Sequence, residues 1–327
     1  KFIDMYAGRL RNQVSFMLSA CNFYMPIFEE ALDAYGLPLE LRYLPIIESA
    51  LNPSAVSRAG ASGLWQFMIG TGKIYGLESN SLVDERRDPI KATWAAARYL
   101  KEMYDIYGDW NLVIAAYNCG PGTINKAIRR ANGETDYWKI YNYLPKETRG
   151  YVPAFIAANY VMTYYCDHNI CPMETNIPAS TDTVQVNKNL HFEQIADLCN
   201  VPLDQIKSLN PQYKKQMIPG DSKPYTLRLP IDAISTFIDK QDTIYAHRAD
   251  ELFRNRKTVA VKEITPSTRK TTTAVAGKGK LTYYTIKSGD TLSTIAGKYG
   301  VTIKDIQRWN GMSNTKIAAG KRLKIYK

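Results

Sequence analysis

Glu48 is the acidic residue with the most apolar surroundings in this sequence, because it lies within the segment Leu44–Leu51. A carboxyl group held among isoleucine and leucine side chains loses hydration of its charged form, so its pKa rises. Such a group can stay protonated at neutral pH and act as a general acid. The alternative is a glutamate that points to solvent from an amphipathic helix, and this segment alone does not decide between the two.

Three further segments combine a turn or a helix end with polar side chains. They are Gly60–Met68 with Gln66 and Met68, Ala115–Gly122 with Tyr117 and Asn118, and Glu147–Val152 at the start of a helix. Glycine lets the backbone approach a ligand closely. Each segment also has a purely structural interpretation: a loop that enters a core helix, a helix cap, and a glutamate that favours a helix N-terminus.

Helices are expected to carry these segments. The predicted helices run from Pro38 until Asn52-Pro53 ends the first one, from Asp88-Pro89 to Tyr107-Gly108, from the Asp109 cap to Tyr117, and from about Lys146 to Tyr165. No strand-like alternation of any length interrupts them. Residues 1–175 are therefore predicted to form an all-α domain.

The composition bounds the class of protein. The chain has 327 residues, of which 45% are hydrophobic and 22% are charged, which indicates two or three folded domains and excludes a disordered or collagen-like chain. No apolar run approaches the roughly 18 residues that a membrane-spanning helix needs. The sequence begins at Lys1 without a basic and apolar leader, so the nature of any membrane anchor upstream of Lys1 stays open.

The C-terminal half carries the positive charge and an internal repeat. Residues 1–181 have a net charge of −1 and residues 182–327 of +12, which favours a polyanionic partner for the second half. At a shift of 100 residues, apolar and turn positions coincide, including Asn210 with Asn310 and Gly220 with Gly320. Each copy is predicted to be a small α+β (βααβ) module. The expected segments are 182–232, a helical connector 233–255, a flexible linker 256–281 and a second module 282–327.

In this order, the four segments of residues 20–165 resemble the catalytic domain of the lytic transglycosylases. The resemblance rests on Glu-Ser at 48 and 49, Gly-Leu-Trp-Gln-Phe-Met at 63–68, Ala-Tyr-Asn with Gly at 116–120, and Glu-Thr-Arg with Tyr-Val at 147–152. The sequence is most similar to the membrane-bound type D group, which adds C-terminal LysM modules. The resemblance implies a multidomain protein with an all-α goose-lysozyme-like catalytic domain, followed by the βααβ modules.

The resemblance also implies a reaction. Glu48 would be the single acid/base that cleaves the bond between N-acetylmuramic acid and N-acetylglucosamine in peptidoglycan, leaving a 1,6-anhydro end. Ordinary glycosidases use two carboxylates, whereas here the nucleophile is a hydroxyl of the sugar itself, and none of the matched motifs is expected to supply a second carboxylate partner. Ser49 and Gln66 would orient sugar groups, Met68 would line the site, Tyr117 and Asn118 would contact the substrate, and Tyr151 would hydrogen-bond Glu48 or the intermediate.

The second module resembles a LysM module, a family that binds N-acetylglucosamine chains in a shallow groove between the loop after strand one and the loop before strand two. The matching residues are Gly289, Asp290, Thr291 and Leu292 in the first loop and Ile317 in the second. The first copy has Asn187–Leu190 where the glycan loop is expected, so its sugar binding is left open.

Three features of the sequence bear on other classes of protein. A helix-turn-helix around Gly300 would suit DNA, but Lys and Arg do not line its second helix, so we expect no nucleic acid. We expect neither metal nor cofactor, because the five cysteines and three histidines have no ligand spacing. Cys166 and Cys171 are left as a candidate disulfide. A non-catalytic wall-binding scaffold and a true muramidase remain alternatives. The expected protein is a monomer of the bacterial periplasm, with an outer-membrane anchor left open.

Overall fold

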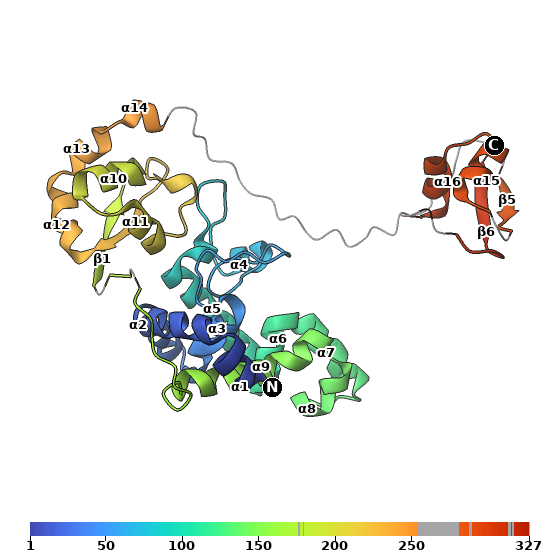
Figure 1. Cartoon of the computed structure of the whole chain (residues 1–327), viewed down its shortest axis with the longest axis horizontal. Coiled ribbons are helices and arrows are strands. Elements are labelled where there is room, and N and C mark those ends of the chain that lie inside the picture. Colours follow the sequence, from blue (N-terminus) through green and yellow to red (C-terminus); the bar gives the residue numbers. More distant parts are fainter. Residues whose placement is uncertain are drawn as a thin grey trace. The chain divides into compact units, whose positions relative to one another are not determined.

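The structure is a computed structural model that describes residues 1–175, 177–178, 180–253, 281–287, 290–312, 315 and 317–326 (Figure 1). It divides into two compact units, Lys1–Glu263 and Ile264–Lys327. The linker predicted at 256–281 lies, except for Leu281, outside the described residues. We describe the two units separately.

The first unit opens with a helical domain, as the sequence predicts. Its helices are α1 (Phe2–Asp4), α2 (Arg11–Ala34), α3 (Leu44–Ser49), α4 (Ile69–Ile74), α5 (Pro89–Tyr107), α6 (Trp110–Cys119), α7 (Pro121–Arg130), α8 (Tyr137–Ile140) and α9 (Lys146–Thr163). The domain also contains the short π-helix η1 (Met5–Arg9) and the short 3₁₀ helices η2 (Leu39–Tyr43), η3 (Glu85–Arg87) and η4 (Tyr141–Tyr143). Strand-like pairing among the described residues of this domain is limited to isolated bridges, such as Val56 with Ser62. The expectation of an all-α domain is confirmed.

Two of the helices begin and end as their capping residues predict. The Asp88 side chain accepts hydrogen bonds from the first backbone N–H groups of α5, Pro89 occupies the first turn, and Gly108 ends the helix with a left-handed φ of 62°. Asp109 caps α6 in the same way. These signals are local, because each cap satisfies backbone groups within one turn of its own residue.

The structure corrects the prediction of one continuous helix from Pro38 to Asn52. Residues 39–43 form the tighter turn η2, and α3 begins only at Leu44. Pro45 has no N–H and cannot donate to the carbonyl of Leu41, which favours a break at this position, although Pro26 and Pro153 lie inside α2 and α9. Ala50 then ends α3 with a left-handed φ of 51°. The break leaves Glu48 in the last turn of a short helix.

The core of the helical domain forms around α6, whose residues Leu112–Ala116 are all buried. Helix α6 contacts α5 and α9, and α2 contacts α5 (Figure 1). Trp65 is fully buried against Phe28, and its indole N–H donates to Oγ1 of Thr93 over 2.9 Å. Because Trp65 lies in the loop between α3 and α4, that loop is fixed to the core.

The first repeat copy follows in the same unit. It contains β1 (Thr181–Val186), β2 (Asn189–His191), α10 (Phe192–Cys199), α11 (Leu203–Leu209), η5 (Lys214–Gln216), β3 (Met217–Pro219) and β4 (Tyr225–Pro230), and the helices α12 (Ile231–Asp239), α13 (Gln241–Ala246) and α14 (Ala249–Leu252) come next. Strands β1 and β4 pair antiparallel, from Thr181 with Pro230 to Val186 with Tyr225. We call residues 180–230 the first LysM-like module.

The second unit contains β5 (Leu281–Thr285), α15 (Leu292–Tyr299), α16 (Ile303–Asn310) and β6 (Arg322–Tyr326), with β5 antiparallel to β6. Both copies thus have the predicted order of strand, helix, helix and strand. The repeat extends to hydrogen bonds. The amide of Asn210 donates to the carbonyls of Ile206 and Arg228 and accepts from the N–H of Arg228. Asn310 makes the same three bonds with Ile306 and Lys324.

The match of Gly220 with Gly320 is wrong. Val184 pairs with Leu227 in the first copy, and Tyr284 pairs with Leu323 in the second. The second strands are therefore related by 96 residues, not by 100. The first copy has four extra residues before its last strand, where β3 adds a second ladder to β2.

Candidate active site

Glu48 lies in the wall of a cavity of about 530 Å³ between the start of the chain, α2, α3 and the loop that follows α3. The lining includes Tyr6, Gln13, Met17, Glu48, Ser49 and Gln66. Glu48 is neither fully buried nor fully exposed. Its carboxyl group is thus enclosed by protein on most sides and open to a ligand on one.

The hydroxyl of Tyr151, on α9, donates a hydrogen bond to Oε1 of Glu48. Burial raises the pKa of Glu48 to about 7, the Tyr151 hydrogen bond opposes this rise, and the negative charge of Glu147 adds to it. A carboxyl group with a pKa near 7 has both its protonated and its ionised forms at neutral pH. It can therefore donate a proton and later take one back.

Glu147 is a carboxylate of the matched motifs that influences Glu48, but it is exposed and, among the described residues, stands apart from those that line the Glu48 cavity. The expectation that these motifs supply no second carboxylate partner stays a prediction. Glu147 lies in the first turn of α9, where its charge suits the helix dipole, as the sequence indicates. The packing of α9 against α3 also lets its negative charge raise the pKa of Glu48. A two-carboxylate mechanism therefore has a named second residue to test.

Ser49 and Tyr117 hold the loop of residues 60–67, which we call the active-site loop. The Ser49 hydroxyl lies 2.9 Å from the carbonyl oxygen of Leu64, and the Tyr117 hydroxyl donates to the carbonyl of Trp65 over 2.7 Å. Both hydroxyl groups thus donate their protons to the backbone. Towards a sugar, each can act only as a hydrogen-bond acceptor. Burial, and then the charge of Glu48, raises the pKa of Tyr117 well above its usual value, so its hydroxyl stays protonated.

Gln66 and Met68 take different positions. Gln66 has a left-handed φ of 49°, lines the Glu48 cavity, and donates from Nε2 to the carbonyl of Gly63 over 2.7 Å. Met68 is the N-cap residue of α4 and, among the described residues, stands apart from those that line the Glu48 cavity. The side-chain oxygen of Asn118 accepts a hydrogen bond from Thr148 over 2.8 Å, which ties α6 to α9.

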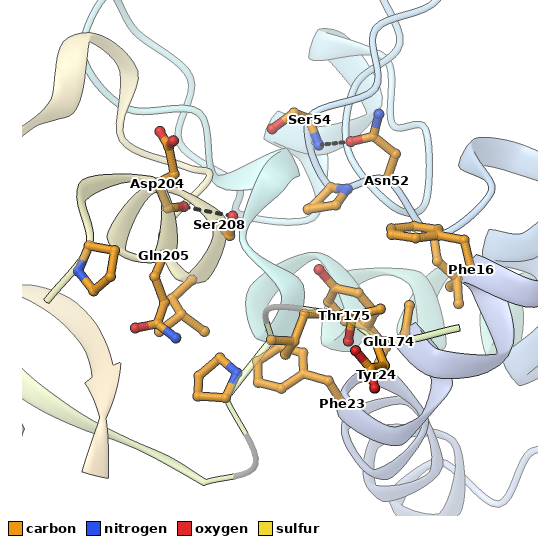
Figure 2. A pocket seen from close by; sticks show the side chains of 17 residues that line it. Phe16, Phe23, Tyr24, Asn52, Ser54, Glu174, Thr175, Asp204, Gln205 and Ser208 are labelled. Carbon is orange, nitrogen blue, oxygen red and sulfur yellow. Dashed lines mark hydrogen bonds between the residues drawn. The ribbon is translucent and has the colours of Figure 1, made fainter. Parts of the chain in front are cut away.

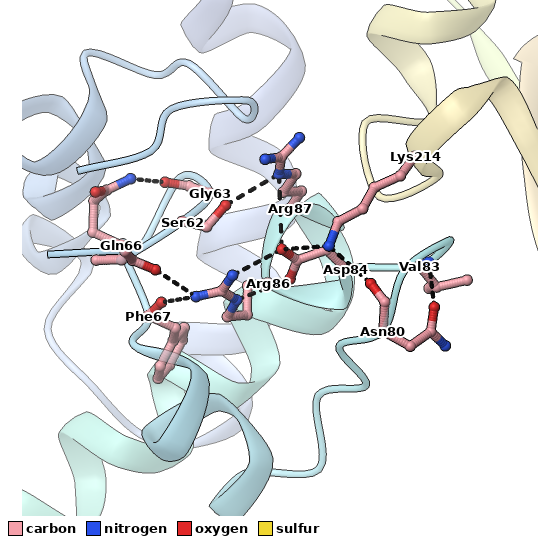
Figure 3. A network of polar contacts seen from close by, with 12 residues as sticks. Ser62, Gly63, Gln66, Phe67, Asn80, Val83, Asp84, Arg86, Arg87 and Lys214 are labelled. Carbon is pink, nitrogen blue, oxygen red and sulfur yellow. Dashed lines mark hydrogen bonds and ion pairs between the residues drawn. The ribbon is translucent and has the colours of Figure 1, made fainter. Parts of the chain in front are cut away.

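The sequence missed several residues around Glu48. Tyr6, Gln13 and Met17 line its cavity, yet the start of the chain carries no motif that marks them. The sequence also missed Arg86, whose guanidinium donates to the carbonyls of Gly60 and Phe67 at the two ends of the active-site loop (Figure 3). A signal was present in the run of charges Asp84–Asp88, but such a run usually marks a solvated turn.

A larger cleft of about 1050 Å³ lies between α2, residues 51–54 and α11 (Figure 2). Its wall combines aromatic rings, such as Phe16 and Phe23, with polar groups such as Asn52 and Gln205. Residues 51–54 line this cleft, whereas Ala50 and Ala55 line the Glu48 cavity. Different residues of one short segment thus line the two hollows, and Glu48 belongs to the smaller.

In the second module, the predicted glycan loop is shaped by its own side chains. Asp290 accepts hydrogen bonds from the hydroxyl of Tyr284 and the N–H of Lys287, both at 2.8 Å. Thr291 caps α15, and Leu292 is buried in the module core. Ile317 packs, partly buried, against the same core. Gly289 lies outside the described residues.

Two further observations concern the candidate disulfide and the membrane. Cys166 and Cys171 are both exposed, and in the described structure they are free thiols. Among the described residues, each helix is too short or too polar to cross a bilayer.

Three known domain families match the chain. Residues 25–140 match the transglycosylase SLT domain, residues 180–246 the LysM-like domain of lytic transglycosylase MltD, and residues 284–325 the LysM domain. An autolysin from Enterococcus faecalis is 51% identical over 49 residues, which cover 15% of this chain and 7% of that protein.

A relative and a solved structure that match over longer stretches are named as lytic transglycosylases. The membrane-bound lytic murein transglycosylase D of Escherichia coli K12 is 33% identical over 296 residues, which is 89% of this chain. The chain spans 60% of the length of that relative. The crystal structure of the 70 kDa soluble lytic transglycosylase of Escherichia coli covers 44% of this chain and 24% of its own, with 29% identity and a TM-score of 0.38. By its SLT domain and the two LysM-type domains that follow, the chain belongs to the lytic transglycosylase family, in the group of membrane-bound lytic murein transglycosylase D.

Proposed function

We propose that this chain cleaves the β-1,4 bond between N-acetylmuramic acid and N-acetylglucosamine in peptidoglycan without water and leaves a 1,6-anhydro-muramic acid end. The observation that carries the proposal is Glu48, in the wall of a cavity, hydrogen-bonded by Tyr151 and with a pKa raised to about 7. The name and sequence of the type D relative support the substrate class.

Glu48 performs two proton transfers in this proposal. Its protonated carboxyl gives a proton to the glycosidic oxygen as the bond from that oxygen to C1 of muramic acid breaks. The resulting carboxylate then takes the proton from the C6 hydroxyl while O6 bonds to C1, so the enzyme returns to its starting protonation state. Well-oriented intramolecular attack reaches effective molarities of about 10⁵–10⁸ M, so one carboxylate suffices.

The neighbouring residues support Glu48 in this role. Burial, and then the charge of Glu48, raises the pKa of Tyr151 well above its usual value, so its hydroxyl remains a donor to the carboxylate. Ser49 and Tyr117 hold the active-site loop, Gln66 lines the cavity while its Nε2 donates to the carbonyl of Gly63, and Asn118 stands at the junction of α6 and α9. Met68, at the N-cap of α4, is the residue of the predicted set for which we propose no contact with the reacting sugar.

The second module is proposed to bind N-acetylglucosamine-containing glycan through the loop of residues 289–292 and the segment at Ile317. Because Leu292 is buried, its contribution would come from its backbone. A domain tethered to an immobile polymer gains local concentration for the catalytic unit by linkage alone. Since the proposed substrate is a wall polymer, we propose that the protein is located in the bacterial periplasm. We also propose a monomer, and the name of the type D relative, which is membrane-bound, supports a membrane anchor, which we place in the outer membrane.

The test is the mass of the products. Purified protein is incubated with isolated peptidoglycan, and the released fragments are separated and weighed. The proposal expects fragments one water lighter than those of a muramidase. Fragments with reducing muramic acid ends would establish a hydrolase, for which Glu147 is the candidate second carboxylate. Wall binding without any fragment would establish a scaffold.

A further inference from the structure

The loop of residues 78–84, which we call the docking loop, leaves the helical domain and enters the core of the first LysM-like module. Leu82 and Val83 are fully buried there and belong to the same apolar cluster as Phe192 and Tyr213. The backbone also pairs across this junction, because Asp84 donates to the carbonyl of Gln212 over 2.8 Å and Lys214 donates to that of Leu82 over 2.6 Å. The module is thus completed by two side chains of the catalytic domain.

Asp84 links this junction to Arg86. The two carboxylate oxygens of Asp84 accept from Nε and Nη2 of Arg86, each at 2.8 Å, and Nζ of Lys214 lies 3.7 Å from Oδ2 (Figure 3). Asp84 and Arg86 are both buried. Burial disfavours the charge of Asp84, but Arg86, Lys214 and Arg87 hold its pKa below the usual range. Asp84 therefore stays ionised, and a paired buried charge has one favoured geometry.

Arg86 then reaches the active-site loop. Its Nη1 donates to the carbonyl of Gly60 over 2.8 Å and to that of Phe67 over 2.9 Å (Figure 3). Gly63 packs on the Arg86 backbone so closely that a Cβ at this position would lie 1.8 Å from the Arg86 carbonyl oxygen. The guanidinium group thus binds both ends of the loop, and Gln66, next to one of these ends, lines the site.

The first module has also lost the free loops that a glycan groove needs. The segment after β1 and the segment before β4 pair with each other, as β2 and β3, from Asn189 with Pro219 to His191 with Met217. Gly220 packs against the Lys188 backbone, and a Cβ there would lie 2.2 Å from the Lys188 carbonyl oxygen. Backbone groups that pair across the groove are not available to a sugar.

From these contacts we propose that the first LysM-like module clamps the active-site loop of the catalytic domain, and that Arg86 is the positioning residue that joins them. Only the expected effect of the clamp on turnover rests on the proposed function. The clamp is a property of the chain with or without substrate. It gives the module a mechanical role in place of the glycan binding of its family.

Two lysines provide a matched pair of variants. Lys214 and Lys223 both reach from the module to the docking loop, but Lys214 pairs with Asp84, whereas Lys223 pairs with Glu78 over 2.7 Å, away from Arg86. Lys214→Met should weaken the clamp, because it removes the ion pair with buried Asp84 and the hydrogen bond to the Asn80 carbonyl. Lys223→Met removes a shorter and more exposed ion pair of the same docking loop and leaves Asp84 and Arg86 untouched. Arg86→Lys keeps the charge but loses the fork that binds Asp84 and two carbonyls at once.

The first measurement is hydrogen exchange of the full chain, followed by mass spectrometry of peptides that cover residues 60–67. The proposal expects faster exchange in Arg86→Lys and Lys214→Met and unchanged exchange in Lys223→Met. The amide of Ser62 reports directly, because it donates to the carbonyl of Phe67 that Arg86 also binds. Equal exchange in the two lysine variants, or a folded Arg86→Lys with full loop protection, would overturn the clamp.

The second measurement is turnover of a soluble glycan oligomer. Since a small misplacement of a catalytic loop can lower the rate by up to about a hundredfold, we expect kcat to fall about tenfold in Arg86→Lys and less in Lys214→Met. KM should stay within about twofold, because ground-state contacts with the glycan remain. A change in KM alone would contradict a positioning role. If the unaltered protein forms no anhydro product, the proposed function fails while the exchange experiment still decides on the clamp.

Discussion

The hydroxyl of Tyr151 donates a hydrogen bond to Oε1 of Glu48, which joins α9 to the last turn of α3. The two residues lie 103 positions apart in the chain. The bond favours the ionised carboxylate, whereas burial and the charge of Glu147 favour the protonated acid. The pKa of about 7 is the balance of these opposing effects.

Removal of that hydroxyl should shift the balance upward. In Tyr151→Phe the carboxylate loses a donor, so the pKa of Glu48 rises above about 7 and the fall in kcat/KM on the alkaline side moves to higher pH. The maximal rate should fall by about 10²- to 10³-fold, as for other removed donors at a developing charge. The pH profile of kcat/KM on a soluble glycan checks this, and an unshifted alkaline limb would contradict it.

Glu48→Gln should abolish the anhydro product and keep binding to peptidoglycan, because glutamine cannot donate or take up the proton. Mass spectrometry of the digest and a pulldown with isolated wall measure the two effects. Ser49→Ala is the neighbouring control, since it removes a contact to the active-site loop but leaves the carboxyl group in place. Appreciable turnover by Glu48→Gln would mean that another residue is the acid.

Glu48→Gln should also change how stability depends on pH. Because the folded pKa is raised from 4.5 to about 7, the native state binds more protons than the unfolded state between these values, and the carboxyl group costs free energy as pH rises through them. The cost is complete above about pH 7 and amounts to at most about 3 kcal/mol. Urea unfolding should find Glu48→Gln more stable than the unaltered chain at pH 8 and nearly equal to it at pH 4.

Glu147→Gln separates the lyase from the hydrolase. Loss of this charge removes an influence that raises the pKa of Glu48, so the alkaline limb of the kcat/KM profile should move to lower pH. The product should still be the anhydro sugar, because the proposed step needs one carboxylate. A variant that releases no fragments would instead assign Glu147 a direct part in the reaction.

The sequence predicted what local chemistry determines. Asp88, Pro89 and Gly108 define both ends of α5, because each acts on backbone groups within one turn. The effect of Pro45 is also local, because this residue has no N–H to donate to a helix hydrogen bond. The apolar spacing on both sides of it nevertheless predicts one continuous helix, and this prediction was wrong. For Glu48 the apolar neighbours suggested the raised pKa, but the contacts of Tyr151 and Glu147 depend on how α9 packs.

The clamp could not be predicted from sequence, because it depends on which distant surfaces meet. Leu82 and Val83 lie in a short polar stretch and carry no period of strand or helix. Their burial is decided by the module that follows some hundred residues later. Likewise, Arg86 in its run of charges has the composition of a solvated turn, and only the fold places its guanidinium between Asp84 and the active-site loop.

Leu82→Ala should test the docking loop by stability. The side chain is buried at 1% exposure, so its truncation should cost about 2–4 kcal/mol. Leu39→Ala is the matched control, because Leu39 is 43% exposed and a surface change usually stays within about 0.5 kcal/mol. Urea unfolding of the full chain measures both. A single shifted transition for the catalytic domain and first module would show that they unfold together, and two separate transitions would contradict their joint packing.

Substitution of Asn210 and of Asn310 should have different effects on the enzyme, although the two side chains make equivalent hydrogen bonds in their modules. Asn210→Ala and Asn310→Ala each leave the groups of a helix end and a last strand without their amide partner. Each change should cost its own module about 1–3 kcal/mol. Because the first module holds the active-site loop, Asn210→Ala should lower kcat on a soluble glycan oligomer. Asn310→Ala should leave that kcat unchanged and weaken retention on isolated peptidoglycan. The reverse assignment of the two defects would place glycan binding in the first module and contradict both proposals.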